Sequence, residues 1–333
     1  MKVLSICPNP SDGTSWYRAA LPMARLQQSH DNFQFVEYGR SDLDWSDMVN
    51  FDILFIQRPY GVKFLELANK AITLGLKVWV DFDDMIWDVP EHSVARASYG
   101  KKVANEIIML IKHLNPEKTI ITVSTQELKE QVLLISPVAN VWVIANALDE
   151  KIFFPLPKKS SPRIVDFAWR GSDTHQQDLH IHYNTLKEVT KSHTVEFIGH
   201  NPFWAREFKH VILSHPGGLL EYFKYISQRK WGAFVVMLED NTFNRCKSNI
   251  MYLEAVYAGA NVIAPAWPEW NRPGVLTYGE GGKYPDLLNA MYEYTCMTDE
   301  KCNIEYQKTA FDVKDNYKLS EQNSVRYNKL YYL

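Results

Sequence analysis

The segment 238–265 carries residue types suited to chemistry on an anion. It reads LEDNTFNRCKSNIMYLEAVYAGANVIAP, which predicts strand, loop, helix and strand, with Ser248 as the N-cap of a helix over 248–258. Arg245 and Lys247 then fall in the loop before the helix. The free N–H groups and the dipole at a helix amino end favour an anion, and two cations strengthen that preference. The segment predicts a diphosphate cradle, unless both cations are ordinary solvated charges.

Glu254 follows in the same predicted helix, more than one turn beyond its start. At that distance its carboxylate would not face the anion directly. It could instead reach the hydroxyls of a ribose attached to the diphosphate.

A second turn of similar composition occurs in WRGSDTHQQDL, residues 169–179, directly after a predicted strand. Two such turns in one sheet could surround a single nucleotide diphosphate. The residues that could contact it are Arg170, Gly171, Ser172 and His175. Each has a plain structural alternative, because glycine suits turns, serine caps helices and histidine is common on surfaces.

The first half of the chain offers PNPSDGTSWYRAALPMARL, residues 8–26, just after the first predicted strand. Gly13 would let the backbone approach a ligand closely, and Arg18 could enter a cleft. No GxGxxG fingerprint is present there, which argues against a dinucleotide cofactor and a dehydrogenase.

Acidic residues cluster in VDFDDMIWDVPEH, residues 80–92, at the end of another predicted strand. The cluster could bind a divalent cation, provide a general base for an acceptor hydroxyl, or hold its loop through hydrogen bonds to backbone N–H groups. Trp87 among the acids favours an acceptor pocket, since sugars and bases stack on aromatic rings. Asp83 and Asp84 are the candidate bases.

The elements that position these loops alternate between strand and helix. Short apolar runs predict strands at 2–7, 33–38, 52–57, 77–82, 119–124, 141–146, 163–169, 194–199, 233–238 and 261–264. Helical patterns occupy 61–74, 125–134, 176–189, 218–229 and 248–258, and the chain is helical after about 284. This alternation indicates doubly wound α/β sheets.

The segment PLPKKSSP, residues 155–162, interrupts both patterns and predicts a linker. We therefore expect a Rossmann-like first domain over 1–154, a second over 163–310 and a helical tail over 311–333 that returns to the first domain. Two such domains face each other across a cleft, where ligands collect at the carboxyl ends of the strands.

The residues near the linker have simpler explanations. Ser124 or Thr125 fits a helix N-cap, and Asn146 fits a role in stabilising the turn into the second domain.

Composition narrows the class of protein. The 333 residues have 36 Lys and Arg against 39 Asp and Glu, a net charge of −3, so no basic field indicates tight nucleic-acid binding. No apolar run reaches the roughly 18–20 residues of a membrane span, and the amino end lacks a secretory signal. The four cysteines match no zinc or redox spacing, which favours reduced thiols in a cytoplasmic protein.

Over nearly its whole length the sequence resembles the nucleotide-sugar-dependent glycosyltransferases of GT-B fold, in particular the group 1 or family-4 class. Four blocks in the same order carry the resemblance: DGTSWYRAALPMARL, VWVDFDDMIWDVP, FAWRGSDTHQQDL and FNRCKSNIMYLEAVYAGANVIAP. The last block is the most specific.

The resemblance implies that the last block binds the donor's diphosphate and ribose, with Lys247 and Glu254 in those roles and Arg245 or Arg170 as the second cation. Asn244 and Ser248 complete the expected donor-binding set. The resemblance also implies a retaining, metal-independent enzyme with no cofactor beyond its nucleotide-sugar donor. One position departs from the class, because Cys246 stands where a second glutamate often lies near the donor sugar.

The expected activity is glycosyl transfer from a nucleoside diphosphate to a hydroxyl of a glycan, a lipid-linked acceptor or a small molecule. A narrower alternative is a viral-type enzyme that acts on a hydroxylated base in DNA. A second alternative is a module that binds a nucleotide or glycan without turnover, which the substitution at Cys246 favours. An epimerase or phosphorylase on the same fold is a further possibility.

Overall fold

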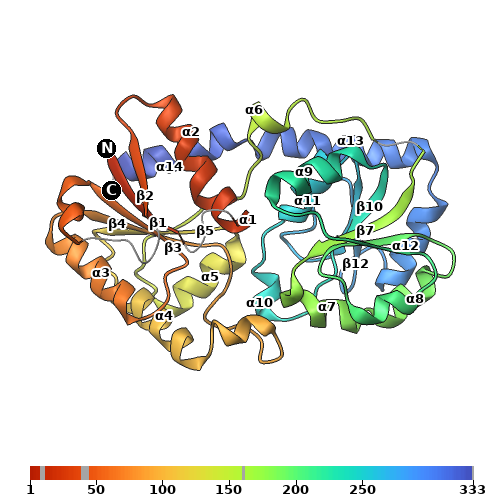
Figure 1. Cartoon of the computed structure of the whole chain (residues 1–333), viewed down its shortest axis with the longest axis horizontal. Helices are drawn as coiled ribbons and strands as arrows, with labels where there is room; N and C mark the ends of the chain where they lie inside the picture. The colour runs from red at the N-terminus through yellow and green to blue at the C-terminus, as the bar shows by residue number, and fades with distance from the viewer. Residues whose placement is uncertain (8–11, 39–44, 160–161, 332–333) are drawn as a thin grey trace.

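The structure, a computed structural model, describes residues 1–7, 12–38, 45–159 and 162–331 and consists of two α/β halves side by side (Figure 1). Of the segments discussed above, residues 8–11, two linker positions (160 and 161) and Tyr332 lie outside the described residues.

The first half is built on a six-stranded parallel sheet in the order β2-β1-β3-β4-β5-β6. Its strands are β1 (Lys2–Ile6), β2 (Gln34–Tyr38), β3 (Ile53–Gln57), β4 (Lys77–Phe82), β5 (Thr119–Val123) and β6 (Val141–Val143). Val3 pairs with Phe35 on one side of β1 and with Ile53 on the other, and all neighbouring strands are parallel.

The second half repeats the plan with a parallel sheet in the order β12-β11-β10-β7-β8-β9. Its strands are β7 (Val165–Gly171), β8 (Val195–Gly199), β9 (Val211–Ser214), β10 (Trp231–Val235), β11 (Asn261–Pro265) and β12 (Val275–Tyr278). In each sheet the strand order reverses direction at a central strand, and loops at such a switch point leave room for a ligand.

Helices cover both faces of each sheet (Figure 1). In the first half α2 (Leu21–Ser29) and α14 (Leu319–Tyr331) lie on one face, and α3 (Val62–Thr73), α4 (Lys101–His113) and α5 (Gln126–Ile135) lie on the other. In the second half α9 (Leu219–Gln228), α11 (Ile250–Tyr257) and α13 (Asp299–Asn316) lie on one face, opposite α7 (Gln176–Ile181), α8 (Tyr183–Val189) and α12 (Leu287–Cys296). Short helices α1 (Gly13–Ser15), α6 (Glu150–Phe153) and α10 (Thr242–Arg245) lie near the junction of the halves.

The predicted pair of Rossmann-like, doubly wound domains is confirmed. Strands covered on both faces are apolar throughout, which is why short unbroken apolar runs identified them. Every residue of β3, β5, β10 and β11 is buried.

Several local predictions were wrong or incomplete. The helix expected over 176–189 is two helices, α7 and α8, that meet at His182. Strands β9 and β12 and helices α2 and α4 were not predicted. Strand β9 is only half-buried along its length, so it lacks the apolar run that marks a central strand.

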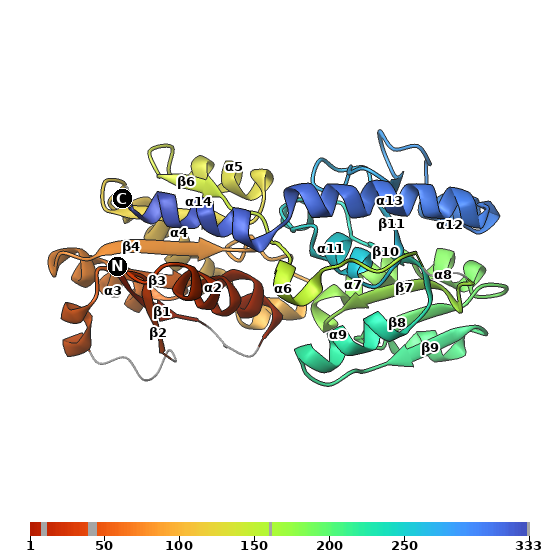
Figure 2. The ribbon, with the colours of Figure 1, turned by 90° about the horizontal axis from the view of Figure 1, so that it is seen from above.

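The C-terminal helix α14 returns to the first half, as expected (Figure 2). Leu330 packs into the same apolar cluster as Met23 and Leu26 of α2. Asn323 donates a hydrogen bond to the carbonyl of Pro22 at 2.9 Å, and the ring of Tyr327 stacks on His30 at 3.8 Å. The chain therefore crosses between the halves twice, through the segment after α6 and through Tyr317 between α13 and α14.

We expect Leu330→Ala to lower the free energy of unfolding by about 2 kcal/mol, because it leaves a cavity between α14 and α2. Val325→Ala on the same helix removes a side chain that is 38% exposed and serves as the matched control. Urea unfolding would measure both variants. Equal losses would contradict the packing of α14 described above.

Candidate functional site

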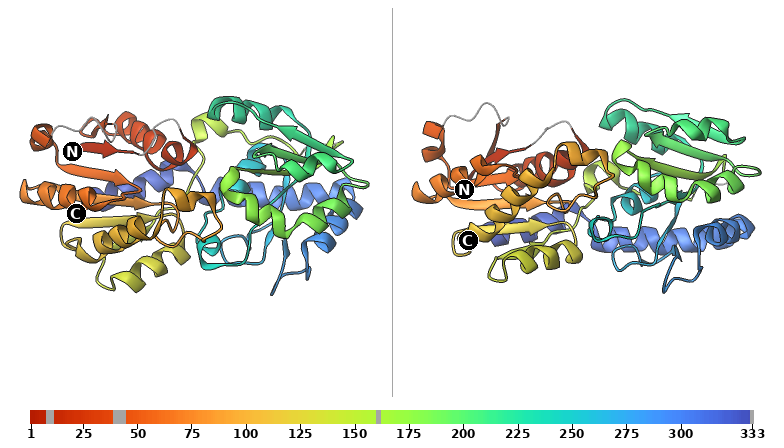
Figure 3. Two further views of the ribbon diagram at one scale, coloured as in Figure 1. Left: turned by 60° about the horizontal axis from the view of Figure 1, so that its bottom comes forward. Right: turned by 90° about the horizontal axis from the view of Figure 1, so that it is seen from below.

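A cavity of about 950 Å³ lies between the two halves, walled by loops that follow the strands of both sheets. Most of the residues predicted from the sequence line it: Gly13, Arg18, Asp83, Asp84, Arg170, Gly171, Ser172, His175, Lys247, Ser248 and Glu254. Three of the predicted residues do not line the cavity that the described residues form: Trp87, Asn244 and Arg245. The loop between β4 and α4, orange in Figure 3, lies against the second half.

Lys247 lies between two helices at the edge of the cleft. Helix α10 ends at Arg245, and α11 begins at Ile250, so residues 246–249 form a short connection. The Nζ atom of Lys247 is 3.4 Å from Oδ1 of Asp84, across the cleft in the other half. Because Ile250 and Met251 in the first turn of α11 also line the cleft, helix-end N–H groups lie beside this lysine.

The expected N-cap role of Ser248 is wrong. The N-cap of α11 is Asn249, whose side chain makes no capping hydrogen bond. The Ser248 hydroxyl instead accepts a hydrogen bond at 2.9 Å from Nδ2 of Asn146, in the first half. The contact between halves thus uses the oxygen that would otherwise cap the helix.

Arg245 points away from the cleft. Its guanidinium binds Asp240 through Nε at 2.6 Å and Nη2 at 2.8 Å, and it lies over the Trp267 ring. The Arg245 side chain is 43% exposed. Of the two arginines considered as the second cation, only Arg170 lines the cleft.

Arg170 and Glu254 form an ion pair deep in the cleft, with 2.7 Å between Nε and Oε2. Two tyrosines donate hydrogen bonds to the same carboxylate: Tyr222 of α9 at 2.7 Å and Tyr17 of the first half at 3.3 Å. Burial, reinforced by the Glu254 charge, raises the pKa of both tyrosines well above the ordinary value, so both remain hydroxyl donors. Neither tyrosine was predicted.

His175 and Asn244 belong to one hydrogen-bonded group around Asp178. Nδ1 of His175 is 2.7 Å from Oδ2 of Asp178, and Asn244 Nδ2 donates to Oδ1 of Asp178 at 2.7 Å. Burial lowers the pKa of His175 although the nearby Asp178 carboxylate opposes this change, so a neutral imidazole faces the cleft. Asn244 is buried and joins the Lys247 loop to the His175 turn.

Gly171 is required by packing within its own half. A Cβ atom at this position would lie 2.6 Å from the Trp169 ring. The carbonyl of Gly171 accepts a hydrogen bond from the amide of His200 at 2.8 Å. The neighbouring hydroxyls of Ser172 and Thr174 are 2.6 Å apart and face the same cleft. Gly13, in contrast, would tolerate a Cβ, whose closest neighbour is a leucine side chain at 3.9 Å.

Arg18 lines the cleft, but its charge is fully engaged. The guanidinium binds Asp81 through Nε at 3.0 Å and Nη2 at 2.6 Å, and both side chains are almost completely buried. Nη1 donates to the carbonyl of Ile144 at 2.5 Å and to Oδ1 of Asn146 at 3.3 Å. These hydrogen-bond partners of Arg18 all belong to the first half, and its predicted ligand-binding role stays a prediction.

Asp83 and Asp84 share one arginine, Arg58, which follows strand β3. Arg58 binds Asp83 through Nε and Nη2, and its Nη2 is 2.8 Å from Oδ2 of Asp84. Burial raises the pKa of Asp83 although Arg58 opposes the change. Lys247 and Arg58 together outweigh burial at Asp84 and lower the pKa of that carboxyl. One cleft thus holds a basic carboxylate beside a firmly ionised one.

Sequence reasoning missed Arg58, although it was detectable as a cation directly after a strand, in the same position as the acids that follow β4. Its φ of 46° is unusual for a residue other than glycine. Trp87, which was predicted to stack on an acceptor, is 6% exposed and packs edge-on against Phe82 at 5.3 Å. Its ring belongs to the core beneath the acidic loop.

Cys246 is completely buried and belongs to the apolar core of the first half. Its Sγ atom is 3.9 Å from Sδ of Met85, and burial raises the pKa of the thiol to about 12. The side chain at the position of the class's second glutamate therefore points away from the cleft and stays uncharged.

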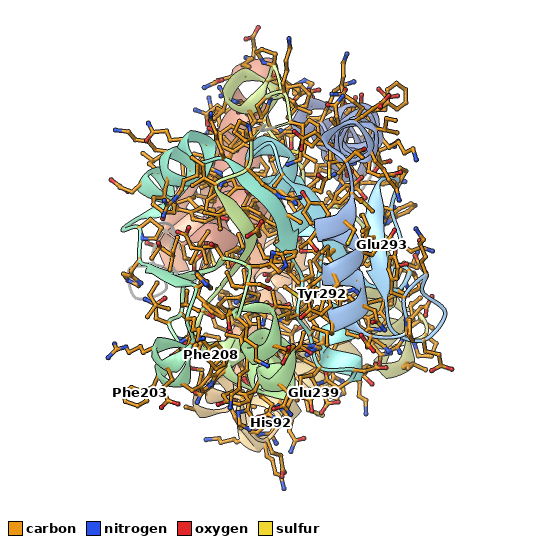
Figure 4. The ribbon with its side chains drawn as sticks, turned by 90° about the vertical axis from the view of Figure 1, so that its right-hand side faces the viewer. His92, Phe203, Phe208, Glu239, Tyr292 and Glu293 are labelled. Atoms are coloured by element: carbon orange, nitrogen blue, oxygen red, sulfur yellow. The ribbon has the colours of Figure 1, made fainter. Side chains whose placement is uncertain are left out.

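A smaller cavity of about 300 Å³ adjoins the cleft and shares Asp173 and Thr174 with it. His92 of the first half lines it. Nε2 of His92 lies 3.1 Å from a carboxylate oxygen of Glu239, as the close approach of the two labelled side chains in Figure 4 shows. The halves thus also meet at the outer edge of the cleft.

Within residues 1–7, 12–38, 45–159 and 162–331, no three His, Cys, Asp or Glu side chains are placed to hold a metal ion together. Nor does any described helix have the length and apolar character needed to cross a membrane.

Comparisons with known proteins identify the architecture. No family model matches the chain, and no curated sequence does. HepE from Anabaena in complex with UDP has a TM-score of 0.69 at 11% identity over 100% of both chains. A glycosyltransferase from Rickettsia africae has a TM-score of 0.66 at 10% identity, covering 99% of this chain and 97% of that one. WaaB, a lipopolysaccharide outer core galactosyltransferase, has a TM-score of 0.61 at 13% identity, covering 100% of this chain and 99% of that one. The chain therefore has the two-domain GT-B fold of these solved structures.

Proposed function

We propose that the protein is a glycosyltransferase that moves a sugar from a nucleoside diphosphate to an acceptor hydroxyl. One observation carries the proposal: Lys247 and Arg170 of the second half line the same cleft as Asp83 and Asp84 of the first half. The cleft thus contains cations that could stabilise a leaving diphosphate and a carboxylate that could activate the acceptor hydroxyl.

On the donor side, breaking the glycosidic bond leaves negative charge on the β-phosphate. Lys247, Arg170 and the amino end of α11 would stabilise that charge. Among the described residues, Lys247 meets the first half through the 3.4 Å approach of its ammonium group to Asp84, a contact that a diphosphate can replace. Glu254 accepts hydrogen bonds from Tyr17 and Tyr222 and is paired with Arg170, and it would exchange one of these contacts for a ribose hydroxyl.

On the acceptor side, Asp83 would take the proton from the attacking hydroxyl. A raised pKa makes a carboxylate a stronger base, and the nearby Arg58 holds it in one orientation. Asp84, whose pKa is lowered, would remain an anion that orients Lys247.

Donor identity and stereochemistry are also part of the proposal. HepE, of the same fold, has been solved with UDP and with UDP-glucose, which favours a uridine diphosphate sugar as donor here. Retention and metal independence follow from the resemblance to the family-4 class. Retention in a single step requires that the acceptor hydroxyl attack the face of the sugar from which the diphosphate leaves. The two cations in the cleft supply charge where a metal would otherwise do so. The anomer of the product, read by NMR, and the effect of EDTA on turnover would test both points.

A binding module without turnover is the competing function, because Cys246 leaves no carboxylate at that position. Thermal shifts with UDP, GDP and ADP would identify the base, since ligand at 100 times its dissociation constant stabilises by roughly 2.7 kcal/mol. A shift with no hydrolysis or transfer of the matching sugar nucleotide would favour the module.

We expect Lys247→Ala to lower kcat by about 100-fold or more, the cost of removing one group that stabilises transition-state charge. Arg245→Ala is the matched control, since this cation is close in sequence but points to solvent, and its kcat should stay near that of the wild type. Initial rates with a labelled sugar nucleotide would measure both. Equal losses, or an unchanged Lys247→Ala enzyme, would refute the donor-site assignment.

The pH profile tests Asp83. Its carboxyl must be ionised to accept a proton, and its pKa is raised above 3.8, so kcat/KM should rise with pH through a midpoint above that value. Asp83→Asn should remove this acid limb and most of the activity while preserving UDP binding. An acid limb that persists in Asp83→Asn would assign the base elsewhere.

A further inference from the structure

The connection Cys246–Lys247–Ser248 belongs to the second half, yet each of its residues contacts the first half. Oγ1 of Thr125 donates a hydrogen bond to the carbonyl of Cys246 at 2.9 Å. Nδ2 of Asn146 donates to Oγ of Ser248 at 2.9 Å. Lys247 lies between these two contacts, with Asp84 beside its ammonium group.

Both donors are themselves fixed. Thr125 is buried and caps α5, where its oxygen accepts a hydrogen bond from the amide of Leu128 at 3.2 Å. Asn146 is buried, and its Oδ1 accepts from Arg18, which Asp81 holds through two further contacts. The two hydrogen bonds therefore tie the connection to rigid parts of the first half.

Within its own half, backbone hydrogen bonds hold the first two residues of the connection: the amide of Cys246 donates to the carbonyl of Thr242 at 3.2 Å, and the amide of Lys247 donates to the carbonyl of Asn244 at 3.1 Å. The connection lies between the four-residue helix α10 and the start of α11, and its residues are not helical. A lysine on an unfixed backbone would lose conformational freedom on meeting a ligand, and that loss would weaken binding.

We propose that Thr125 and Asn146 are positioning residues that hold the connection on both sides of Lys247, through the carbonyl of Cys246 and the hydroxyl of Ser248, so that the acceptor-side half assembles the donor's diphosphate site. The inference rests on the function proposed above. It implies that diphosphate binding needs both halves in contact, whereas a nucleoside alone binds the second half without this requirement.

The experiment compares UDP with uridine by calorimetry on the full-length chain. Thr125→Val and Asn146→Ala should each raise the Kd of UDP by about three- to tenfold, as loss of one hydrogen bond implies, and leave the Kd of uridine unchanged. Thr125→Ser, which keeps the hydroxyl, should bind UDP as the wild type does.

Two controls separate positioning from other roles. Thr119→Val makes the same substitution at a buried threonine of β5, away from the cleft, and should leave UDP binding unchanged. In a Lys247→Ala background, Thr125→Val and Asn146→Ala should cause no further loss, because they act through Lys247.

The outcomes distinguish the two proposals. If the wild type binds no nucleoside diphosphate, both the proposed function and this inference fall. If the wild type binds UDP and the two variants bind it equally well, lose uridine in parallel, or lose further affinity without Lys247, only the inference falls. Thermal unfolding without ligand would show that the variants are folded under the conditions of the assay.

Discussion

The acidic segment at the end of β4 brings together one buried carboxylate, Asp81, and two partly buried ones, Asp83 and Asp84, and the rest of the cleft depends on how these charges are neutralised. Removing an ion from water costs several kcal/mol unless it is paired and hydrogen-bonded. Arg18 neutralises Asp81, and Arg58 neutralises Asp83 and reaches Asp84. Lys247 completes the set from the opposite half.

This pairing determines which cations remain for a ligand. Arg18 and Arg58 are held by short contacts inside the first half. If either arginine turned to a ligand, its carboxylate partner would lose its counter-ion. Lys247 has the longest of these ion contacts and lies beside the amino end of α11. Arg245, in contrast, is paired with Asp240 in solvent and does not line the cleft.

The donor side departs from the family-4 pattern in one respect. Cys246 lies in the core of the first half instead of presenting an acid to the donor sugar. Its burial brings the connection around Lys247 against the first half. A cysteine in place of the glutamate thus gives up a contact to the donor sugar and makes a contact between the halves.

The sequence was sufficient to predict the two sheets, because strands buried on both faces are unbroken apolar runs. It was also sufficient to identify Lys247 and Glu254 as residues that line the cleft, while their roles toward a donor stay predictions. The sequence could not show which of Arg170 and Arg245 lines the cleft, because the direction of a side chain depends on partners such as Asp240 that only the folded loop provides. Tyr17, Tyr222 and Arg58 were missed for a related reason: each meets its carboxylate partner only through tertiary contacts.

The most direct measurement is a crystal structure of the protein with UDP bound. The account predicts a β-phosphate oxygen about 2.8 Å from Nζ of Lys247, the distance of a charge-assisted hydrogen bond, with the ribose hydroxyls beside Glu254. UDP bound elsewhere, with the Lys247–Asp84 contact intact, would contradict it.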